Sequence, residues 1–241
     1  MRPPWDGGRQ IRARFKARSD RGFGPADSVR SKRIFGAVLA TAVTSGGRSW
    51  VAWRSQLRTE GGTTGEADVQ IARRRAGARH FDRALLLDHA PSPDSPSLVS
   101  LAAGRDGAAV AAWSTTHGGD PSLTVVRVAH VSATGVAGVT ALASYTSDDE
   151  GQPSAAYADD GDATVTWTQP TPVTPRASSG YVSLRPAGRT WGPPELVTAE
   201  PMVVPLAATY APRSTAPTLL GVSAAAGGHH STLRAITRTA P

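Results

Sequence analysis

The chain has 241 residues, of which 39% are hydrophobic, and a formal net charge of +7. This length suits one large β domain or two small ones, and no stretch approaches the run of about 18 apolar residues that a membrane-spanning helix requires. Because the chain has no cysteine, disulfides, thiolate metal sites and a cysteine nucleophile are excluded.

The positive charge is concentrated in the first part of the chain. Residues 1–90 carry 18 basic and 8 acidic side chains, whereas residues 91–241 carry 8 basic and 11 acidic ones. A basic region can contact nucleic acid or another anionic polymer. However, 24 of the 26 basic residues are arginine, and with abundant Ala, Gly and Pro this skew is typical of codon bias in a high-GC genome.

The first strands are predicted directly after a short tail. Residues 1–10 are expected to be disordered. Apolar and basic side chains alternate along residues 11–16, which predicts a strand with one buried and one wet face. Gly22 and Phe23 then mark a turn, and a second strand runs towards Val29. Residues 11–29 are therefore predicted to form the outer half of a repeat unit.

The next segment allows two interpretations. Residues 31–42 combine a basic step, a short apolar run and an Ala-x-Ala sequence, as in a signal peptide. We favour the first strand of a complete unit, because its distance to Trp53 agrees with the later units. No signal peptide is expected at the N-terminus of this chain, and the compartment is left open.

Two markers recur along the chain. A glycine turn followed by small and β-branched residues closes three times on a tryptophan, and a later glycine turn is followed four times by an aromatic or apolar residue. Two independent markers with one period of about 55 residues indicate an internal repeat. The expected structural repeat residues are Trp53, Trp113, Trp167, Phe23, Phe81, Val136 and Trp191.

Each unit is predicted to contain four short strands and no useful helix. A Gly/Asp hairpin joins strands one and two, strand two ends at the tryptophan, a longer polar loop leads to strand three, and a glycine turn leads to strand four. Units of this kind are typical of propeller blades. We therefore predict an all-β protein, a propeller-like array of four-stranded antiparallel blades with about four units of roughly 55 residues.

The domain boundaries follow from the repeat. One propeller-like domain is expected over residues 11–238, with complete units at about 34–90, 91–145 and 146–200 and partial units at 11–29 and 203–238. We hypothesise that the two partial units share one blade, which would hide open sheet edges. The alternative is a piece of a longer propeller that begins in mid-blade. In both cases the recurring rings pack between stacked blades.

One turn resembles a known family. Residues 184–191, Leu-Arg-Pro-Ala-Gly-Arg-Thr-Trp, resemble the Ser-x-Asp-x-Gly-x-Thr-Trp turn of sialidase-type (Asp-box or BNR) β-propellers. Gly188, Thr190 and Trp191 match, whereas Leu184 and Pro186 occupy the Ser and Asp positions. Residues 11–23 and 68–81 match less well, so the repeats would be degenerate. The resemblance implies the fold more than an activity.

Catalytic residues are not expected. A sialidase requires an arginine cluster, a tyrosine nucleophile with a carboxylate partner, and an acid/base aspartate. Tyr157 and Tyr181 fall on repeat strands, where packing accounts for them, and no Arg/Tyr/Glu set stands out. The sequence also lacks a Gly-x-Ser-x-Gly elbow, and His117 and His130 are interpreted as surface histidines.

Metal sites and cofactors are not expected either. His229 and His230 are adjacent, so on a strand their side chains would point apart. The acidic runs at residues 148–150 and 159–162 lack a full calcium-loop pattern, and we interpret them as solvated turns.

The leading hypothesis is a non-catalytic binding or scaffold module of unknown ligand, with a carbohydrate or a protein as partner. One alternative is a glycoside-acting, sialidase-like enzyme or its truncated remnant. The second is a binder of nucleic acid or another anionic polymer through the basic region that includes Arg73, Arg74 and Arg75. Nucleic acid is disfavoured, because these arginines are not interleaved with the aromatic residues on which bases stack.

Overall fold

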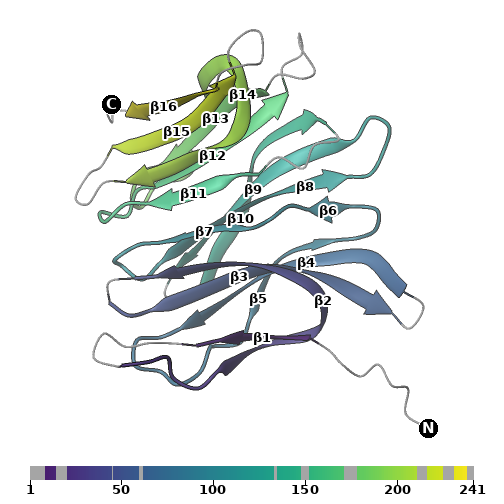
Figure 1. Ribbon diagram of the computed structural model, residues 1–241, viewed down its shortest axis with the longest axis vertical. Coiled ribbons are helices and arrows are strands. Elements are labelled where there is room, and N and C mark those ends of the chain that lie inside the picture. The colour runs from purple at the N-terminus through teal and green to yellow at the C-terminus, as the bar shows by residue number, and fades with distance from the viewer. Residues whose placement is uncertain are drawn as a thin grey trace.

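The computed structural model describes residues 9–14, 21–44, 46–59, 62–132, 135–147, 152–170, 178–210, 216–224 and 231–237. Within these ranges every regular element is a β-strand, and the strands form three antiparallel sheets. The sheets are stacked along the long axis of the molecule, from β1 at one end to β16 at the other (Figure 1). The prediction of an all-β protein built from antiparallel sheets is confirmed.

The first sheet contains two groups of strands that share one long strand. Its order is β1 (Arg9–Ala13), β2 (Asp27–Val43), β3 (Ser49–Thr59), β4 (Gly62–Arg74) and β5 (Leu85–Ala90). The first part of β2 pairs with β1, with Val29 opposite Ile11, and its last part pairs with β3, with Leu39 opposite Trp53. A four-stranded meander therefore runs from the last part of β2 to β5.

The second and third sheets repeat this meander. The second contains β6 (Ser95–Pro96), β7 (Ser100–Ala103), β8 (Ala109–His117), β9 (Leu123–Ser132) and β10 (Gly135–Thr146), with β6 and β7 both paired to β8. The third contains β11 (Ser154–Tyr157), β12 (Ala163–Pro170), β13 (Ser178–Arg185), β14 (Glu195–Tyr210), β15 (Pro217–Ala224) and β16 (Ser231–Thr237) in chain order. The long β14 pairs first with β13 and then with β15, as β2 does with its two neighbours.

The turn that precedes each tryptophan strand has one geometry. In the first sheet the amide of Thr44 donates to the carbonyl of Arg48, and the amide of Gly47 donates to the carbonyl of Thr44. The same pair of hydrogen bonds recurs within residues 104–108 and 158–162. The equivalent glycines, Gly47, Gly107 and Gly161, have φ angles of 77°, 81° and 100°, a region that favours glycine. The glycine signal in the sequence therefore corresponds to a recurrent hairpin turn.

The three recurrent tryptophans lie on equivalent strands. Trp53 on β3, Trp113 on β8 and Trp167 on β12 are each fully buried. Each ring packs towards the preceding strands: Trp53 with Ile11 and Val29, Trp113 with Val69 and Ile71, and Trp167 with Val126 and Val128. A fully buried ring removes a large apolar area from water. Trp113 and Trp167 therefore join neighbouring sheets, whereas Trp53 joins β3 to the outer strands β1 and β2 of its own sheet.

The other expected repeat residues differ in their burial. Phe81 and Trp191 are half-buried and pack against the inter-sheet clusters. Phe23, in contrast, is 68% exposed and does not act as a packing group, because it lies at the outer end of the stack. Val136 pairs with Val131 through its backbone, and its side chain lies outside the described residues.

Three expectations differ from the structure. The tryptophan strands β3, β8 and β12 continue past their tryptophans to Thr59, His117 and Pro170, because backbone pairing with the next strand does not depend on hydrophobic side chains. The first strand begins at Arg9, inside the segment expected to be disordered, and residues 1–8 lie outside the described chain.

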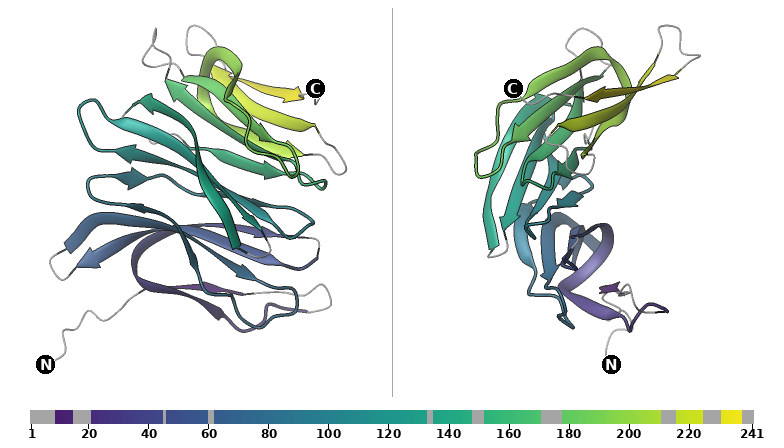
Figure 2. Two further views of the ribbon diagram at one scale, coloured as in Figure 1. Left: turned by 180° about the vertical axis from the view of Figure 1, so that it is seen from behind. Right: turned by 90° about the vertical axis from the view of Figure 1, so that its left-hand side faces the viewer.

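The third difference concerns the ends of the chain. Within the described residues β1 pairs with β2 alone and β16 with β15 alone. Figures 1 and 2 place β1 and β16 at opposite ends of the stack, so the two ends do not share a blade. The whole three-sheet stack separates them, and its strands lead progressively away from β1.

Candidate functional site

The richest polar cluster lies between the first and second sheets. Alternation along β8 places Trp113, Thr115 and His117 on one face. Arg127 on β9 lies opposite Trp113 in the ladder, and Asp88 comes from β5 of the first sheet. Together with Asp94, from the connection between these sheets, the six side chains form what we call the inter-sheet network.

Asp88 is the centre of this network. Its Oδ2 accepts hydrogen bonds from Trp113 Nε1 at 2.9 Å and from Thr115 Oγ1 at 3.1 Å. Arg127 Nε lies 3.4 Å from the same oxygen. Because the Asp88 carboxylate is only 19% exposed, these contacts compensate for burying its charge. Asp88 thereby joins two sheets through one carboxylate.

His117 completes the network at the end of β8. Its Nδ1 lies 2.6 Å from Asp94 Oδ2, and its Nε2 lies 3.2 Å from Arg127 Nη2. Arginine can only donate, so Nε2 of His117 accepts and its Nδ1–H donates to Asp94. Both ring nitrogens are therefore engaged, which leaves no free lone pair for proton abstraction from a substrate. The imidazole is only partly exposed, unlike the surface histidine that we expected.

The indole groups of the recurrent tryptophans differ in their partners. Only Trp113 donates to a carboxylate, whereas the buried Nε1 atoms of Trp53 and Trp167 have no hydrogen-bond partner in the described chain. The Asp88–Trp113 contact is thus particular to one pair of sheets and is not part of the general repeat.

A second polar cluster lies at the opposite ends of the strands. The hydroxyl of Tyr157 donates to Asp106 Oδ2 at 3.0 Å and lies 3.3 Å from His130 Nε2. Burial, followed by the negative charge of Asp106, raises the pKa of Tyr157. A raised pKa keeps the phenol protonated, whereas an activated nucleophile requires the opposite shift. Tyr157 therefore acts as a hydrogen-bond donor between the second and third sheets.

The position of Tyr157 recurs in the next strand pair. Tyr157 is the last residue of β11 and Tyr210 the last residue of β14, and the hydroxyl of Tyr210 is hydrogen-bonded to Thr164. Burial raises the pKa of Tyr210 to about 12. Tyr157 thus links its strand end to the second sheet, whereas Tyr210 links β14 to β12 within the third sheet.

Histidine 130 lies beside this cluster. Its ring stacks on the Tyr157 ring with a centroid separation of 6.2 Å. Burial lowers the pKa of His130, and the positive charge of Arg185 lowers it further, with partial opposition from Asp106. The imidazole therefore favours its neutral form, although the sequence indicated a surface histidine.

Several arginines bind other residues of the same chain. Arg73 binds Asp82 at 2.7 Å and lies over the Trp50 ring, and Arg73 is the main reason why the pKa of Asp82 is lowered. Arg48 donates to the carbonyl of Asp106 at 2.9 Å, which links the turns of two sheets. The basic residues of β4 therefore do not form one free cationic surface.

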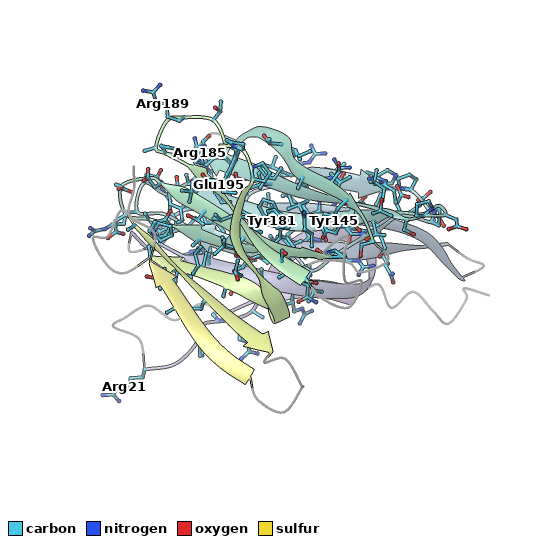
Figure 3. The ribbon with its side chains drawn as sticks, turned by 90° about the horizontal axis from the view of Figure 1, so that it is seen from above. Arg21, Tyr145, Tyr181, Arg185, Arg189 and Glu195 are labelled. Atoms are coloured by element: carbon cyan, nitrogen blue, oxygen red, sulfur yellow. The ribbon has the colours of Figure 1, made fainter. Side chains whose placement is uncertain are left out.

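The labelled charged and aromatic residues of the second and third sheets do not converge on one point with Arg21. In Figure 3, Arg21 lies well apart from Arg185 and Arg189. Tyr181 stacks on Trp167 at 6.0 Å, and the hydroxyl of Tyr145 donates to the carbonyl of Thr168. These aromatic side chains therefore have packing roles.

The candidate metal ligands either lie outside the described chain or serve the turns. Residues 148–150 and 229–230 are outside it. Asp160 Oδ1 accepts from the amide of Asp162, and Asp162 Oδ1 accepts from the amide of Ala187. In the described ranges no group of three or more acidic or histidine side chains is arranged to hold a metal ion.

Sequence reasoning missed the residues that form the inter-sheet network. Asp88, Asp94 and Arg127 stand at no recurrent position, and their partners lie up to 39 residues away in the chain. The only available signal was Asp88 directly after the three leucines of residues 85–87. An isolated carboxylate there indicates a buried partner, but the sequence does not say which one.

Comparison with solved structures finds similar folds. No family model and no curated protein matches the chain. The solved structure of the Hadza microbial sialidase Hz136 is similar to 94% of this chain, with 16% sequence identity and a TM-score of 0.55. The fold is sialidase-like. The chain spans half the length of that sialidase.

The similarity concerns the fold alone, because the identity is low.

The described part of the chain contains no helix that is long and apolar enough to cross a membrane.

Proposed function

We propose that this chain is a non-catalytic binding module, built as a section of about four units of a sialidase-type β-propeller with degenerate Asp-box repeats. Residues 11–238 would form this single repeat domain. The similarity to a sialidase over 94% of the chain and the three recurrent hairpin turns support the propeller assignment. Stacked sheets that bury one another's tryptophans are what a blade array requires.

One observation carries the non-catalytic assignment. The tyrosine with a carboxylate partner, Tyr157, donates to Asp106 and has a raised pKa. A sialidase nucleophile would instead need activation by its carboxylate and a nearby arginine cluster. The partners of Arg48, Arg73 and Arg127 lie within the fold, which also disfavours such a cluster.

The ligand surface that we propose is the end of the sheets that carries His117. There the network presents partly exposed His117 and Arg127 beside the turn at Gly118 and Gly119. Because both ring nitrogens of His117 are already engaged, its imidazole would offer its face to a sugar ring, and the partly exposed guanidinium group of Arg127 would offer N–H donors to sugar hydroxyl groups. A carbohydrate ligand is therefore favoured over an anionic polymer, since Arg127 is already paired with Asp88.

An activity assay tests the non-catalytic assignment. The purified chain is incubated with an aryl sialoside and a panel of other aryl glycosides, and we expect no release of the aryl group above the buffer control. Turnover by the wild type that is abolished in Tyr157→Phe would overturn the proposal in favour of a glycoside-acting enzyme.

A binding assay tests the ligand surface. Chemical shifts of the labelled chain are followed during titration with a panel of oligosaccharides. We expect changes confined to residues near His117 and their loss in His117→Ala, whereas changes elsewhere on the fold would contradict this surface. Retention of the wild type and of His117→Ala on heparin serves as the control for non-specific binding of an anionic polymer.

A further inference from the structure

The first sheet leaves an apolar part of β2 uncovered. Leu39 is 48% exposed and Val43 is 67% exposed. Both side chains lie on the face of the sheet that carries Trp53. Leu39 pairs directly with Trp53, and Val43 lies on the same face because side chains alternate along a strand. Large apolar side chains exposed four residues apart on one strand indicate a surface that another element covers.

The repeat shows what covers the same position in the second sheet. Val43 and Ala103 each end the first strand of a meander, opposite Ser49 and Ala109, so Leu39 corresponds to Val99. Val99 is only 7% exposed. It packs against Trp50 and Ala52 of β3, which belong to the preceding sheet. The missing cover over Leu39 is therefore the first two strands of a preceding meander.

No such strand pair precedes β2 within the described chain. The strands before it, β1 and the first part of β2, contribute Ile11 and Val29, which pack with Trp53. This contact covers the outer part of the first sheet. It leaves residues 39–43 open, where the strand one and strand two positions of an earlier meander would lie.

The C-terminal end of the stack carries a matching strand pair, β14 and β15, whose outer face is not covered by a further sheet of the described chain. Tyr210 pairs with Pro217 as Tyr157 pairs with Ala163, so β14 and β15 correspond to the first two strands of a meander. Their inner face packs through Ala208 and Leu219 on the third sheet.

The outer face of this strand pair carries uncharged side chains. Alternation places Ala207, Thr209, Thr218 and Leu220 on it, and Ala207 and Thr209 are exposed. In the register of the first sheet, Leu220 corresponds to Ala52 of β3, which packs with Val99, and Ala207 and Thr209 correspond to Ala40 and Ala42 of β2.

We propose that the β14–β15 strand pair of a second copy of this chain covers residues 39–43 of β2, in a head-to-tail contact. The β14–β15 pair of the same chain cannot cover residues 39–43, because β2 and β15 lie at opposite ends of the stack (Figures 1 and 2).

The contact continues the packing that already joins the sheets within one chain, and it does not depend on the proposed function. Because its two surfaces are different, it is heterologous, and it produces a closed dimer if the rotation closes and a longer array if it does not.

Light scattering coupled to size-exclusion chromatography tests the contact across a concentration series. We expect the wild type to associate and both Leu39→Arg and Ala207→Arg to be monomeric, because each places a charge in one of the two surfaces. Leu86→Arg, at an apolar residue of β5 that is 56% exposed, is the matched control and is expected to associate like the wild type.

Mixing the two variants decides the direction of the contact. An equimolar mixture of Leu39→Arg and Ala207→Arg retains one intact β14–β15 pair and one intact β2 surface. We therefore expect a heterodimer that neither variant forms alone. A monomeric wild type, association that survives both substitutions, or a mixture that stays monomeric would overturn the proposal, provided that circular dichroism shows each variant to be folded.

Discussion

At the residue scale, Asp88 joins sheets that the repeat alone would hold only by apolar packing. It accepts hydrogen bonds from Trp113 and Thr115 and lies 3.4 Å from Arg127. The carboxylate follows three leucines of β5 and precedes His89, and its charge is compensated by partners from another sheet. Removing one member of a largely buried polar group leaves the others without compensation.

Asp88→Asn tests this role. The amide oxygen can still accept one hydrogen bond, but the ion pair with Arg127 is lost. We expect the free energy of unfolding to fall by about 1–3 kcal/mol, measured by urea denaturation. Asp120→Asn, at an exposed turn residue, is the control and should change stability little. An unchanged denaturation midpoint in Asp88→Asn would contradict the role assigned to the carboxylate.

His130 makes the free energy of unfolding depend on pH in a direction that follows from its pKa. Burial lowers its pKa below the ordinary value of 6.5, so the unfolded chain binds a proton more readily than the folded one. Stability due to this residue is therefore present above pH 6.5 and falls as the pH drops from 6.5 towards the folded-state pKa. Replacement by glutamine should remove this part of the pH dependence.

Histidine titration by NMR provides the measurement. We expect His130 to titrate below 6.5 and His89 above it, because the hydrogen bond that His89 Nδ1–H donates to the Asp68 carboxylate raises the pKa of His89. The two residues thus act as opposite internal references in one experiment. A His130 resonance that titrates at or above 6.5 would refute the effect of burial.

At the element scale, the hairpin turns and the tryptophan strands could be predicted because their signals are local. Gly47, Gly107 and Gly161 stand in the sequence where the structure requires a positive φ. The strand ends past each tryptophan could not be predicted, since backbone pairing continues there without an apolar signal. The contacts of Tyr157 could not be predicted either, because Asp106 lies 51 residues away and only the stacking of sheets brings them together.

The turn at Gly107 has an additional constraint that a substitution can expose. A Cβ atom there would overlap the guanidinium group of Arg48, which donates to the carbonyl of Asp106. Gly107→Ala therefore adds the loss of a cross-sheet hydrogen bond to the strain of a left-handed alanine, about 2 kcal/mol in sum. Gly188 has a φ of 68° and open space around it, so Gly188→Ala introduces only the backbone strain and breaks no hydrogen bond.

Thermal or urea unfolding of the two alanine variants measures the difference. We expect Gly107→Ala to be the less stable of the two. Equal losses in both variants would show that the Arg48 contact contributes nothing to the link between the two turns.

At the scale of the whole molecule, the repeat pattern predicted a succession of antiparallel strands in chain order. It did not predict whether the last strands meet the first. Three meanders with their tryptophans facing one way follow from markers spaced by a regular interval. Whether the last strands meet the first depends on the accumulated twist from sheet to sheet, which no local residue specifies. The hypothesis of a shared blade failed for this reason, and the exposed Leu39 and Val43 mark the place where it would have formed.

The unbroken strand β2 sets where this chain can be divided. Its backbone is paired on both sides of residues 30–34, where the repeat places a border between units, so a cut made there would split a continuous ladder. Shortened or circularly permuted versions should instead begin and end in hairpins such as residues 44–48 or 104–108. The repeat is therefore a unit of sequence, whereas the separable piece of the molecule is offset from it by about half a strand.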